Sequence, residues 1–263
     1  MTFFTKSLGA ITGLAIGLSA TLAAAQEVLR VGVSSGYPPF DVLEPDGTLS
    51  GFDIDIANLL CAEMEMTCEF VDIDWDGIIP ALQANRFDAI VSSMGITEDR
   101  MKQVDFTDRY YYSASALIGP KDTGIASADE AGTAGKAIGV QRATAHECYV
   151  QKFFPGAQMR QYQTSEEAYL DLQTGRIDAV LVDTIPGEEW INSDPKNAET
   201  FAPIADDLYD FPCFGEGIGI AVRKGEDELR EGINAAIEAI RASGAYQEVS
   251  MSYFGRDIYG PSE

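Results

Sequence analysis

The chain has 263 residues, and its 42 Asp and Glu residues outnumber its 18 Lys and Arg residues, so its formal net charge is −24. Such an acidic balance argues against nucleic acid or anionic lipid as a partner, because both would repel the chain. Without an expected leader, about 238 residues remain, which suits one large domain or two modest ones.

The first 25 residues have the pattern of an export signal. Lys6 gives a weakly positive start, an apolar stretch rich in small residues runs to about Leu22, and residues 23–25 are alanines suited to cleavage just before Gln26. A membrane anchor is the alternative, but Gly, Ser and Thr interrupt the stretch, which is short for a span. The leader has no cysteine in or near it, so we do not expect a lipid anchor. No later stretch is long and apolar enough to cross a membrane. We therefore expect a soluble, exported protein.

Strand and helix patterns alternate after the leader. The region 52–64 has apolar residues at helical spacing, at positions 52, 56, 59, 60 and 64. The patterns predict strands at 28–33, 68–71 and 89–92, and helices at 52–64, 75–83 and from Thr97 onward. Such alternation favours parallel pairing and an α/β architecture.

A second series of the same kind follows. It predicts strands at 137–140, 159–162, 177–182 and 218–222, and helices at 144–154, 165–173, 226–242 and 245–253. Two similar series predict two lobes, with chain crossings at 112–119 and 213–217. The predicted division is a leader at 1–25, a first lobe at 26–113 and 214–263, and a second lobe at 114–213.

One segment combines a strand end, a tight turn and a helix start. It runs from Asp88 to Arg100, with Thr97 at the expected helix N-cap. Free amides at a helix start attract an anion, and a guanidinium can hold both oxygens of a carboxylate. The alternative interpretation is a surface loop whose Arg100 is solvated or paired with Asp99 or Asp105.

Ligands of open parallel sheets bind beyond the carboxyl ends of the strands. The segments 34–37, 92–95 and 141–144 and the residue Asp183 all follow predicted strands in this way. We therefore expect them to face one another across a cleft between the two lobes.

The four cysteines suggest two disulfides in an oxidising, exported setting. Cys61 and Cys68 lie close together, at a helix end and a strand start, and we pair them. By elimination, Cys148 is then paired with Cys213, although no feature of the sequence requires that these two are bonded. A metal site is the competing interpretation, but the chain has one histidine and no tight Cys-x-x-Cys motif, so we expect no metal.

A set of motifs in this order resembles a known family. They are Tyr37-Pro38-Pro39-Phe40, Gly51-Phe52-Asp53-Ile54-Asp55, Phe87-Asp88-Ala89-Ile90, Ser92-Ser93 with Ile96-Thr97 and Arg100, Gly139-Val140-Gln141, Thr174 to Ala179, Asp183 and Tyr253-Phe254. The chain resembles the periplasmic solute-binding proteins of polar amino-acid ABC transporters, family 3, and above all binders of lysine, arginine, ornithine and histidine. The resemblance implies a type II periplasmic binding protein fold, with two parallel-rich sheets flanked by helices and a hinge of two crossings. The family also has a disulfide with the spacing of Cys61 and Cys68.

The resemblance also implies roles for individual residues. Arg100 would hold the ligand α-carboxylate with amides near Gly95 and Ala145, and Asp183 would receive the α-ammonium group. The region of Ser92 and Ser93 would assist, and Tyr37 and Trp75 would enclose the ligand side chain. These assignments agree with the charge-assisted pairs that a zwitterion requires.

Three positions depart from the family pattern. Ser34 stands where binders of cationic ligands carry an aspartate, so it brings no countercharge. Gly95 and Ala145 stand where serine and threonine are usual, although Thr144 is adjacent. We therefore expect a polar amino acid or a bulkier N-substituted derivative, such as an opine, rather than a simple amino acid with a cationic tail.

The expected function is capture of this ligand by lobe closure and delivery to an ABC permease, by a periplasmic, monomeric protein without cofactor. An exported enzyme on the same fold, similar to a dehydratase, is the alternative, with His146 or Glu147 as its nearest acid or base. We expect no catalytic residue, and we expect His146 to face solvent or the pocket rim. A soluble ligand-sensing partner of a receptor is a third possibility. Arg142 has no assigned role, and Asp72, Asp74 and Asp76 are expected to form a solvated loop rather than a calcium site.

Overall fold

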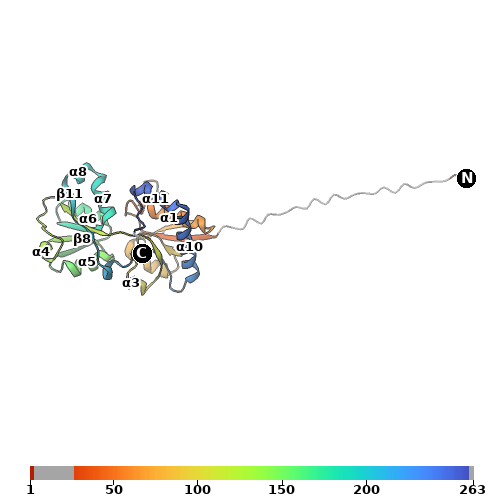
Figure 1. Ribbon diagram of the computed structural model, residues 1–263, viewed down its shortest axis with the longest axis horizontal. Coiled ribbons are helices and arrows are strands. Elements are labelled where there is room, and N and C mark those ends of the chain that lie inside the picture. The colour runs from red at the N-terminus through yellow and green to blue at the C-terminus, as the bar shows by residue number, and fades with distance from the viewer. Residues whose placement is uncertain (3–26, 261–263) are drawn as a thin grey trace.

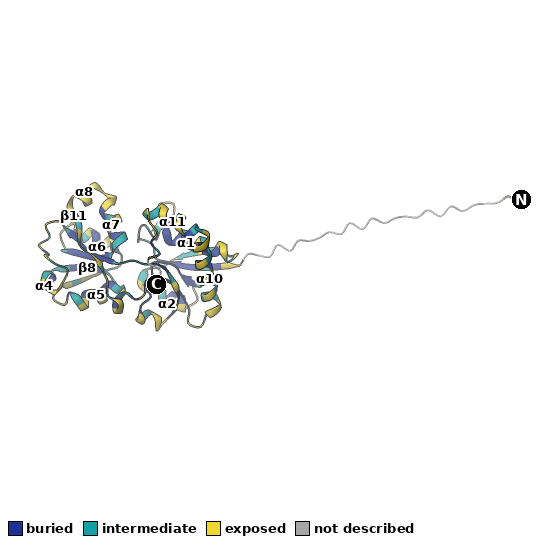
Figure 2. Ribbon diagram, in the orientation of Figure 1, coloured by how far each residue is buried: buried dark blue, intermediate teal, exposed yellow. Residues whose placement is uncertain are grey.

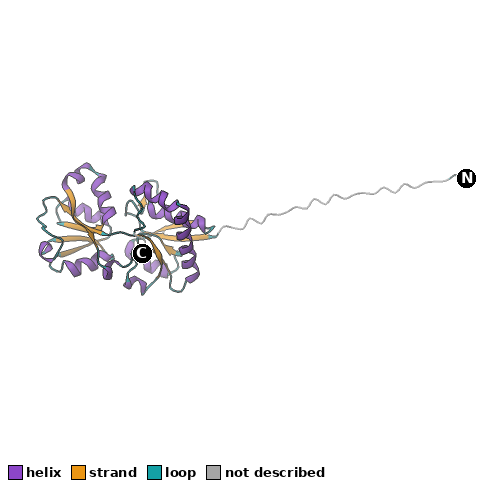
Figure 3. Ribbon diagram, in the orientation of Figure 1, coloured by secondary structure: helices purple, strands orange, loops and turns teal. Residues whose placement is uncertain are grey.

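The computed structural model describes residues 1–2 and 27–260. These residues form two lobes, each built on a five-stranded sheet with helices on both faces (Figures 1 and 3). Apart from residues 1–2, the predicted leader lies outside the described residues. None of the helices within the described ranges is long and apolar enough to span a membrane.

The first lobe holds a sheet of order β4-β1-β5-β12-β6. Its strands are β1 (Val28–Val33), β4 (Thr67–Asp72), β5 (Ala89–Ile90), β6 (Asp105–Tyr111) and β12 (Ile218–Val222). Its helices are α1 (Phe52–Glu63), α2 (Ile78–Gln83), α3 (Glu98–Met101), α10 (Asp227–Ser243) and α11 (Ala245–Phe254), with a 3₁₀ turn at Trp75–Gly77 and a small hairpin of β2 (Val42–Leu43) and β3 (Leu49–Ser50). The sequence dictates α10 clearly, because Ile233, Ile237 and Ile240 recur on its buried face and Gly244 ends it in the left-handed region.

The second lobe holds a sheet of order β11-β7-β10-β8-β9. Its strands are β7 (Ser115–Pro120), β8 (Ala137–Gln141), β9 (Gln158–Tyr162), β10 (Ala179–Asp183) and β11 (Phe201–Leu208). Its helices are α4 (Glu130–Thr133), α5 (Ala145–Phe153), α6 (Ser165–Gln173), α7 (Thr184–Ser193), α8 (Pro195–Thr200) and α9 (Phe211–Phe214). Figure 2 shows buried strands inside each lobe and exposed helix faces outside.

The prediction of parallel pairing is correct for only part of each sheet. β1 pairs in parallel with β4 and β5, and β8 with β9 and β10. β12 instead runs antiparallel to β5 and β6, and β7 runs antiparallel to β10 and β11. The reason is the double crossing, because each segment that enters a lobe from the other one joins the sheet in the reverse direction.

The first predicted crossing, at 112–119, is too long. The chain leaves the first sheet after Tyr111 and joins the second at Ser115, so most of the predicted crossing is the buried strand β7. The return lies between Leu208 and Ile218 and contains α9. The exact lobe boundaries remain a prediction.

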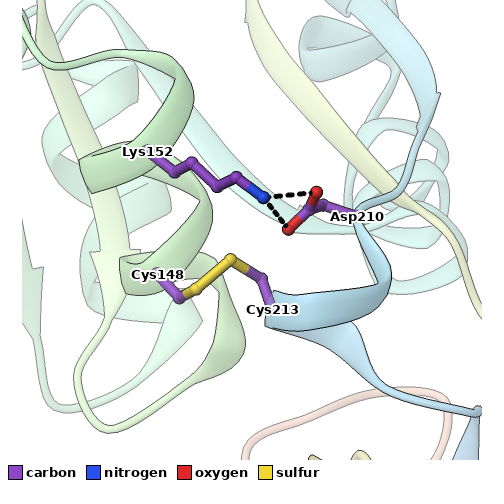
Figure 4. Close-up of a disulfide and its surroundings, with 4 residues drawn as sticks. All are labelled: Cys148, Lys152, Asp210 and Cys213. Carbon is purple, nitrogen blue, oxygen red and sulfur yellow. Dashed lines mark hydrogen bonds and ion pairs between the residues drawn. A yellow bond between two sulfur atoms is a disulfide. The ribbon is translucent and has the colours of Figure 1, made fainter.

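Both predicted cysteine pairs are disulfides in the structure. Cys61 joins Cys68 within the first lobe, and Cys148 on α5 joins Cys213 on α9. Beside the second bridge, Lys152 contacts both carboxylate oxygens of Asp210 at 2.7 and 2.8 Å (Figure 4). Together these contacts fasten the return segment to the helix that begins at the cleft.

Candidate functional site

Every residue predicted to touch a ligand lines one cavity between the lobes. These residues are Ser34, Tyr37, Trp75, Ser92, Ser93, Gly95, Arg100, Thr144, Ala145 and Asp183. They come together because β1, β5, β8 and β10 each end at the cleft, as the strand-end rule predicts. The structure thus assembles one site from both lobes, and the ligand-binding role of its residues remains a proposal.

Arg100 points into this cavity from the short helix α3. Thr97 begins α3 as predicted, with its hydroxyl accepting a hydrogen bond from the Arg100 amide at 3.4 Å. The guanidinium donates to the carbonyl of Gly95 at 3.0 Å and lies 5.2 Å from the centre of the Trp75 ring. Burial lowers the pKa of Arg100 to about 10, and the charge of Asp183 opposes that change, so the group stays cationic at neutral pH.

The alternative interpretation of Arg100 as a surface ion-pair residue is wrong. Asp99 pairs with Lys102 at 2.5 Å, and Asp105 pairs with Lys224 at 2.6 Å. Both acids that would hold Arg100 at the surface therefore have other partners.

Asp183 lies at the end of β10, on the opposite lobe. It occupies the N-cap position of α7, but its side chain makes no capping hydrogen bond to the described backbone. Its carboxylate instead accepts a hydrogen bond from the hydroxyl of Tyr37 and lies 3.5 Å from Nε2 of His146. Burial acts to raise the pKa of Asp183, but His146, Tyr37 and Arg100 together hold it below its ordinary value. The cavity therefore contains a fixed negative charge.

His146 is a wall residue of the cavity, so of the two expected placements the pocket fits and solvent exposure does not. Only 6% of it is exposed, and its Nε2 lies 3.1 Å from the hydroxyl of the buried Ser115. Its Nδ1 lies 3.3 Å from the Thr144 hydroxyl. His146 is buried because it follows the N-cap Thr144 at the start of α5, whose first turn packs against the cleft.

Two buried carboxylates behind the cavity wall were not predicted from the sequence. Asp41 and Asp53 are both 0% exposed. Ser92 donates to Asp41 at 2.7 Å, and Ser93 donates to Asp53 at 2.8 Å, so the acids fix both serine hydroxyls. Burial and the neighbouring Asp53 raise the pKa of Asp41 well above its ordinary value, and burial raises that of Asp53 to about 6. Two carboxyl groups buried together resist carrying two negative charges at once, so they release their protons as a coupled pair.

The two lobes touch each other directly around the cavity. Nε1 of Trp75 donates to the carbonyl of Ala143 at 3.1 Å, and Nη2 of Arg100 donates to the same carbonyl at 3.2 Å. A third contact between the lobes joins Arg142 to the carboxylate of Asp76, with Nε and the oxygen 2.6 Å apart, although the direction of the Nε–H does not suit a hydrogen bond. These contacts belong to a closed arrangement of the lobes.

Apart from His146, the other lining residues are uncharged and include glycine and isoleucine as well as polar and aromatic side chains. They include Ser35, Ser113, Gln141, Ser165, Tyr209 and Phe214, which were not on the predicted list. Gln141 and Ser35 lie within segments that were predicted to reach the cleft, whereas Tyr209 and Phe214 arrive with the return segment. Among the described residues that line the cavity, Asp183 is the sole carboxylate. The site therefore presents one cation and one anion, on different lobes, within a mostly neutral wall.

The geometry defines a two-lobed periplasmic binding protein fold of type II, with its cavity at the lobe junction. The chain belongs to the bacterial extracellular solute-binding proteins, family 3, whose model matches residues 29–256.

The relatives include proteins named for arginine. The L-arginine-binding protein of Pseudomonas aeruginosa is 40% identical over 259 residues, which covers 97% of this chain and 99% of that protein. A solved Salmonella typhimurium periplasmic binding protein described as highly specific for arginine has a TM-score of 0.79 and 31% identity, covering 87% of this chain and 99% of that one. A third structure, an ancestral amino-acid-binding protein described as a precursor of cyclohexadienyl dehydratase, has a TM-score of 0.76 and 32% identity, covering 86% and 95% of the two chains.

Proposed function

We propose that this chain captures an amino acid or an amino-acid derivative in the cavity between its lobes and delivers it to an ABC permease. The observation that carries the proposal is the presence of Arg100 and Asp183, with opposite charges and from different lobes, in the wall of one cavity. A zwitterion that contacts both groups binds the closed arrangement better than the open one, which is the condition for ligand-driven closure.

Each wall residue has a role in this proposal. Arg100 takes the α-carboxylate, because its guanidinium can donate two parallel hydrogen bonds. Asp183 takes the α-ammonium group, with Ser92 and Ser93 supplying hydroxyls nearby. Tyr37 and Trp75 offer flat aromatic faces to the rest of the ligand. Ala145 and Thr144 lie at the start of α5, where free amides favour a negative group.

The proposed ligand class is a polar amino acid or an N-substituted derivative of opine type. Ser34 brings no charge to the end of the cavity where a distal cation would need one. Gly95 keeps a side chain away from the guanidinium, because a β-carbon there would lie only 3.4 Å from Nη1 of Arg100 and 3.3 Å from the carbonyl of Phe214. The names of the relatives make arginine the main competing ligand.

The same geometry supports binding rather than catalysis. His146 contacts Ser115 and Asp183 through the same nitrogen, Nε2, while Nδ1 faces Thr144. A serine–histidine–aspartate triad needs the serine and the aspartate on different ring nitrogens, so this arrangement does not activate Ser115 as a nucleophile. The dehydratase-precursor structure keeps an enzyme as the second candidate function.

The proposed setting is the periplasm, reached through the leader, where the protein acts as a monomer that docks onto its permease. The family and the periplasmic relatives support this setting, and the disulfides Cys61–Cys68 and Cys148–Cys213 suit an oxidising compartment.

Isothermal titration of the leader-free protein tests the proposal. The panel is glutamine, lysine, arginine, histidine and octopine, preceded by mass spectrometry of any ligand released on denaturation. We expect at least one panel member to bind near or below micromolar concentration, about −8 kcal/mol or stronger. Tight binding of arginine contradicts the ligand class, absence of binding across the panel contradicts the amino-acid proposal, and chemical turnover of a bound ligand favours the enzyme.

A further inference from the structure

A second cavity adjoins the ligand cavity on the far side of Tyr37. We call it the side pocket. Its principal walls are Tyr37 and Pro38 from the first lobe and Tyr169, Trp190, Glu166 and Glu189 from the second. It shares Gly36, Tyr37 and Ser165 with the ligand cavity, so the two spaces have a common wall.

Both lobes build the side pocket, and it exists only while they are closed. Tyr37 of the first lobe packs against the core of the second, and Ile185 at the start of α7 packs against the core of the first. An occupant of the side pocket therefore contacts both lobes, as a ligand of the main cavity does.

Three aromatic rings contribute to the walls of the side pocket. The rings of Tyr169 and Trp190 stack with centroids 4.3 Å apart and planes at 11°, held in place by α6 and α7. Tyr37 supplies the third ring from the opposite lobe. Aromatic faces of this kind attract alkylated ammonium and guanidinium groups through the negative potential above each ring.

The charges at the side pocket have one sign. Glu166 and Glu189 are exposed carboxylates that line it, and no Lys or Arg is among its described lining residues. In addition, the hydroxyl of Tyr169, a residue that is 5% exposed, has no hydrogen-bond partner among the described residues. An occupant with a positive charge and a hydrogen-bond donor would complement both features, whereas a carboxylate would be repelled.

We propose that the side pocket is a binding subsite for an organic cation, an alkylated ammonium or a guanidinium, that adjoins the ligand cavity. The inference rests on the proposed function in one respect, since lobe closure forms both spaces. The ligand cavity has no countercharge at Ser34 for a ligand's positive group. The side pocket offers such a group another place to bind, beyond Tyr37.

Tryptophan fluorescence tests this subsite, because Trp75 and Trp190 are the two tryptophans of the chain and each lines one of the two cavities. The probe is choline, and 3,3-dimethylbutan-1-ol is its uncharged isostere. We expect choline to change the emission of the full mature protein saturably and the isostere to have no such effect. The change should disappear in Trp190→Phe, in which Trp75 is the remaining tryptophan.

Charge-neutral variants provide the decisive comparison. The double variant Glu166→Gln/Glu189→Gln should weaken choline binding by about tenfold, since it removes both carboxylates that face the cation. Glu188→Gln is the matched control, because Glu188 is an exposed neighbour on α7 that does not line the side pocket. Equal effects of choline and its isostere, or equal choline affinities of the double variant and the control, would overturn the proposal.

Two further arms identify the source of the cation and separate this proposal from the function of the main cavity. Displacement of choline by excess L-arginine supports a cation that belongs to the captured ligand, whereas continued choline binding supports a separate solute. Calorimetry of the double variant with the amino-acid panel shows independently whether the main cavity works, so either proposal can fail while the other stands.

Discussion

The guanidinium of Arg100 and the carbonyl of Ala143 meet across the cleft, with Nη2 and O 3.2 Å apart. Trp75 donates to the same carbonyl, so two side chains of the first lobe share one backbone acceptor of the second. Ala143 holds this carbonyl in place with a φ of 58°, in the left-handed region that favours glycine. The backbone at Ala143 is therefore part of the closed arrangement.

This relationship predicts opposite effects for two substitutions of Ala143. Ala143→Gly should keep ligand affinity within about twofold, because glycine adopts this φ readily. Ala143→Val should weaken binding by about tenfold or more, because a β-branched residue is strained there and the shared carbonyl would move. Calorimetry measures the affinity, and small-angle scattering measures the fraction of closed molecules. Equal affinities of the two variants would contradict the role of this carbonyl.

Gly95 predicts a change of ligand preference. The side chain of Gly95→Ser would press against the Arg100 guanidinium and the Phe214 carbonyl, and so narrow the part of the cavity in which we propose that an N-substituent lies. We expect the variant to lose at least about tenfold in affinity for octopine and to bind unsubstituted amino acids as well as before. Titration of both ligand types against both proteins measures the shift. An equal loss of affinity for both ligand types would contradict the proposal that an N-substituent lies beside Gly95.

The buried pair Asp41 and Asp53 predicts a dependence of stability on pH. Because the pKa of Asp53 rises from 3.8 to about 6 on folding, the folded protein retains a proton there that the unfolded chain has already released. The resulting stabilisation is fully present below the unfolded pKa and is lost as the pH rises through about 6. Its size is on the order of 3 kcal/mol.

Urea unfolding of wild type and Asp53→Asn between pH 4 and 7 measures this effect. Wild type should lose stability relative to the variant as the pH rises. Because both proteins share the general repulsion of an acidic chain, that contribution cancels in the difference between their unfolding free energies. Glu63→Gln, at an exposed carboxylate of the same helix, is the control and should show no such shift. A constant difference for Asp53→Asn across this range would exclude the proton on the buried pair.

The two disulfides should contribute unequally to stability. Cys148 and Cys213 are 65 residues apart, whereas Cys61 and Cys68 are 7 apart. Loop-closure entropy then predicts a loss of about 4 kcal/mol for Cys148→Ser/Cys213→Ser and about 2 kcal/mol for Cys61→Ser/Cys68→Ser. Urea unfolding at constant pH measures both losses. The reverse order would mean that chain entropy does not govern these bridges.

Much of the fold could be predicted from the sequence because its signals are local. The strand and helix around Thr97 follow from an apolar run, a cap and a first acidic turn. β11 gave no such signal, since Pro203 and two adjacent aspartates interrupt it. These residues are tolerated because β11 is the edge strand of its sheet.

The residues that line the cavity could be predicted because they follow strand ends. The buried residues that hold this lining in place could not. No spacing rule brings Asp41 and Asp53 together behind Ser92 and Ser93, because that contact joins a loop, a helix and a strand end that meet only in the folded lobe. The Ala143 carbonyl was likewise unpredictable, since a backbone acceptor carries no residue-type signal. The burial of His146 depends on how α5 packs, which its sequence alone does not specify.

The central claim is that Arg100 and Asp183 hold opposite poles of one ligand. Titration of Arg100→Ala and Asp183→Asn with the tightest-binding member of the amino-acid panel tests it most directly, with Arg86→Ala and Glu188→Gln as exposed controls. The predicted result is a loss of about 100-fold or more in each cavity variant, because each removes a charge-assisted contact in a buried site, with no change in the controls. Unchanged affinity in either cavity variant would contradict the claim.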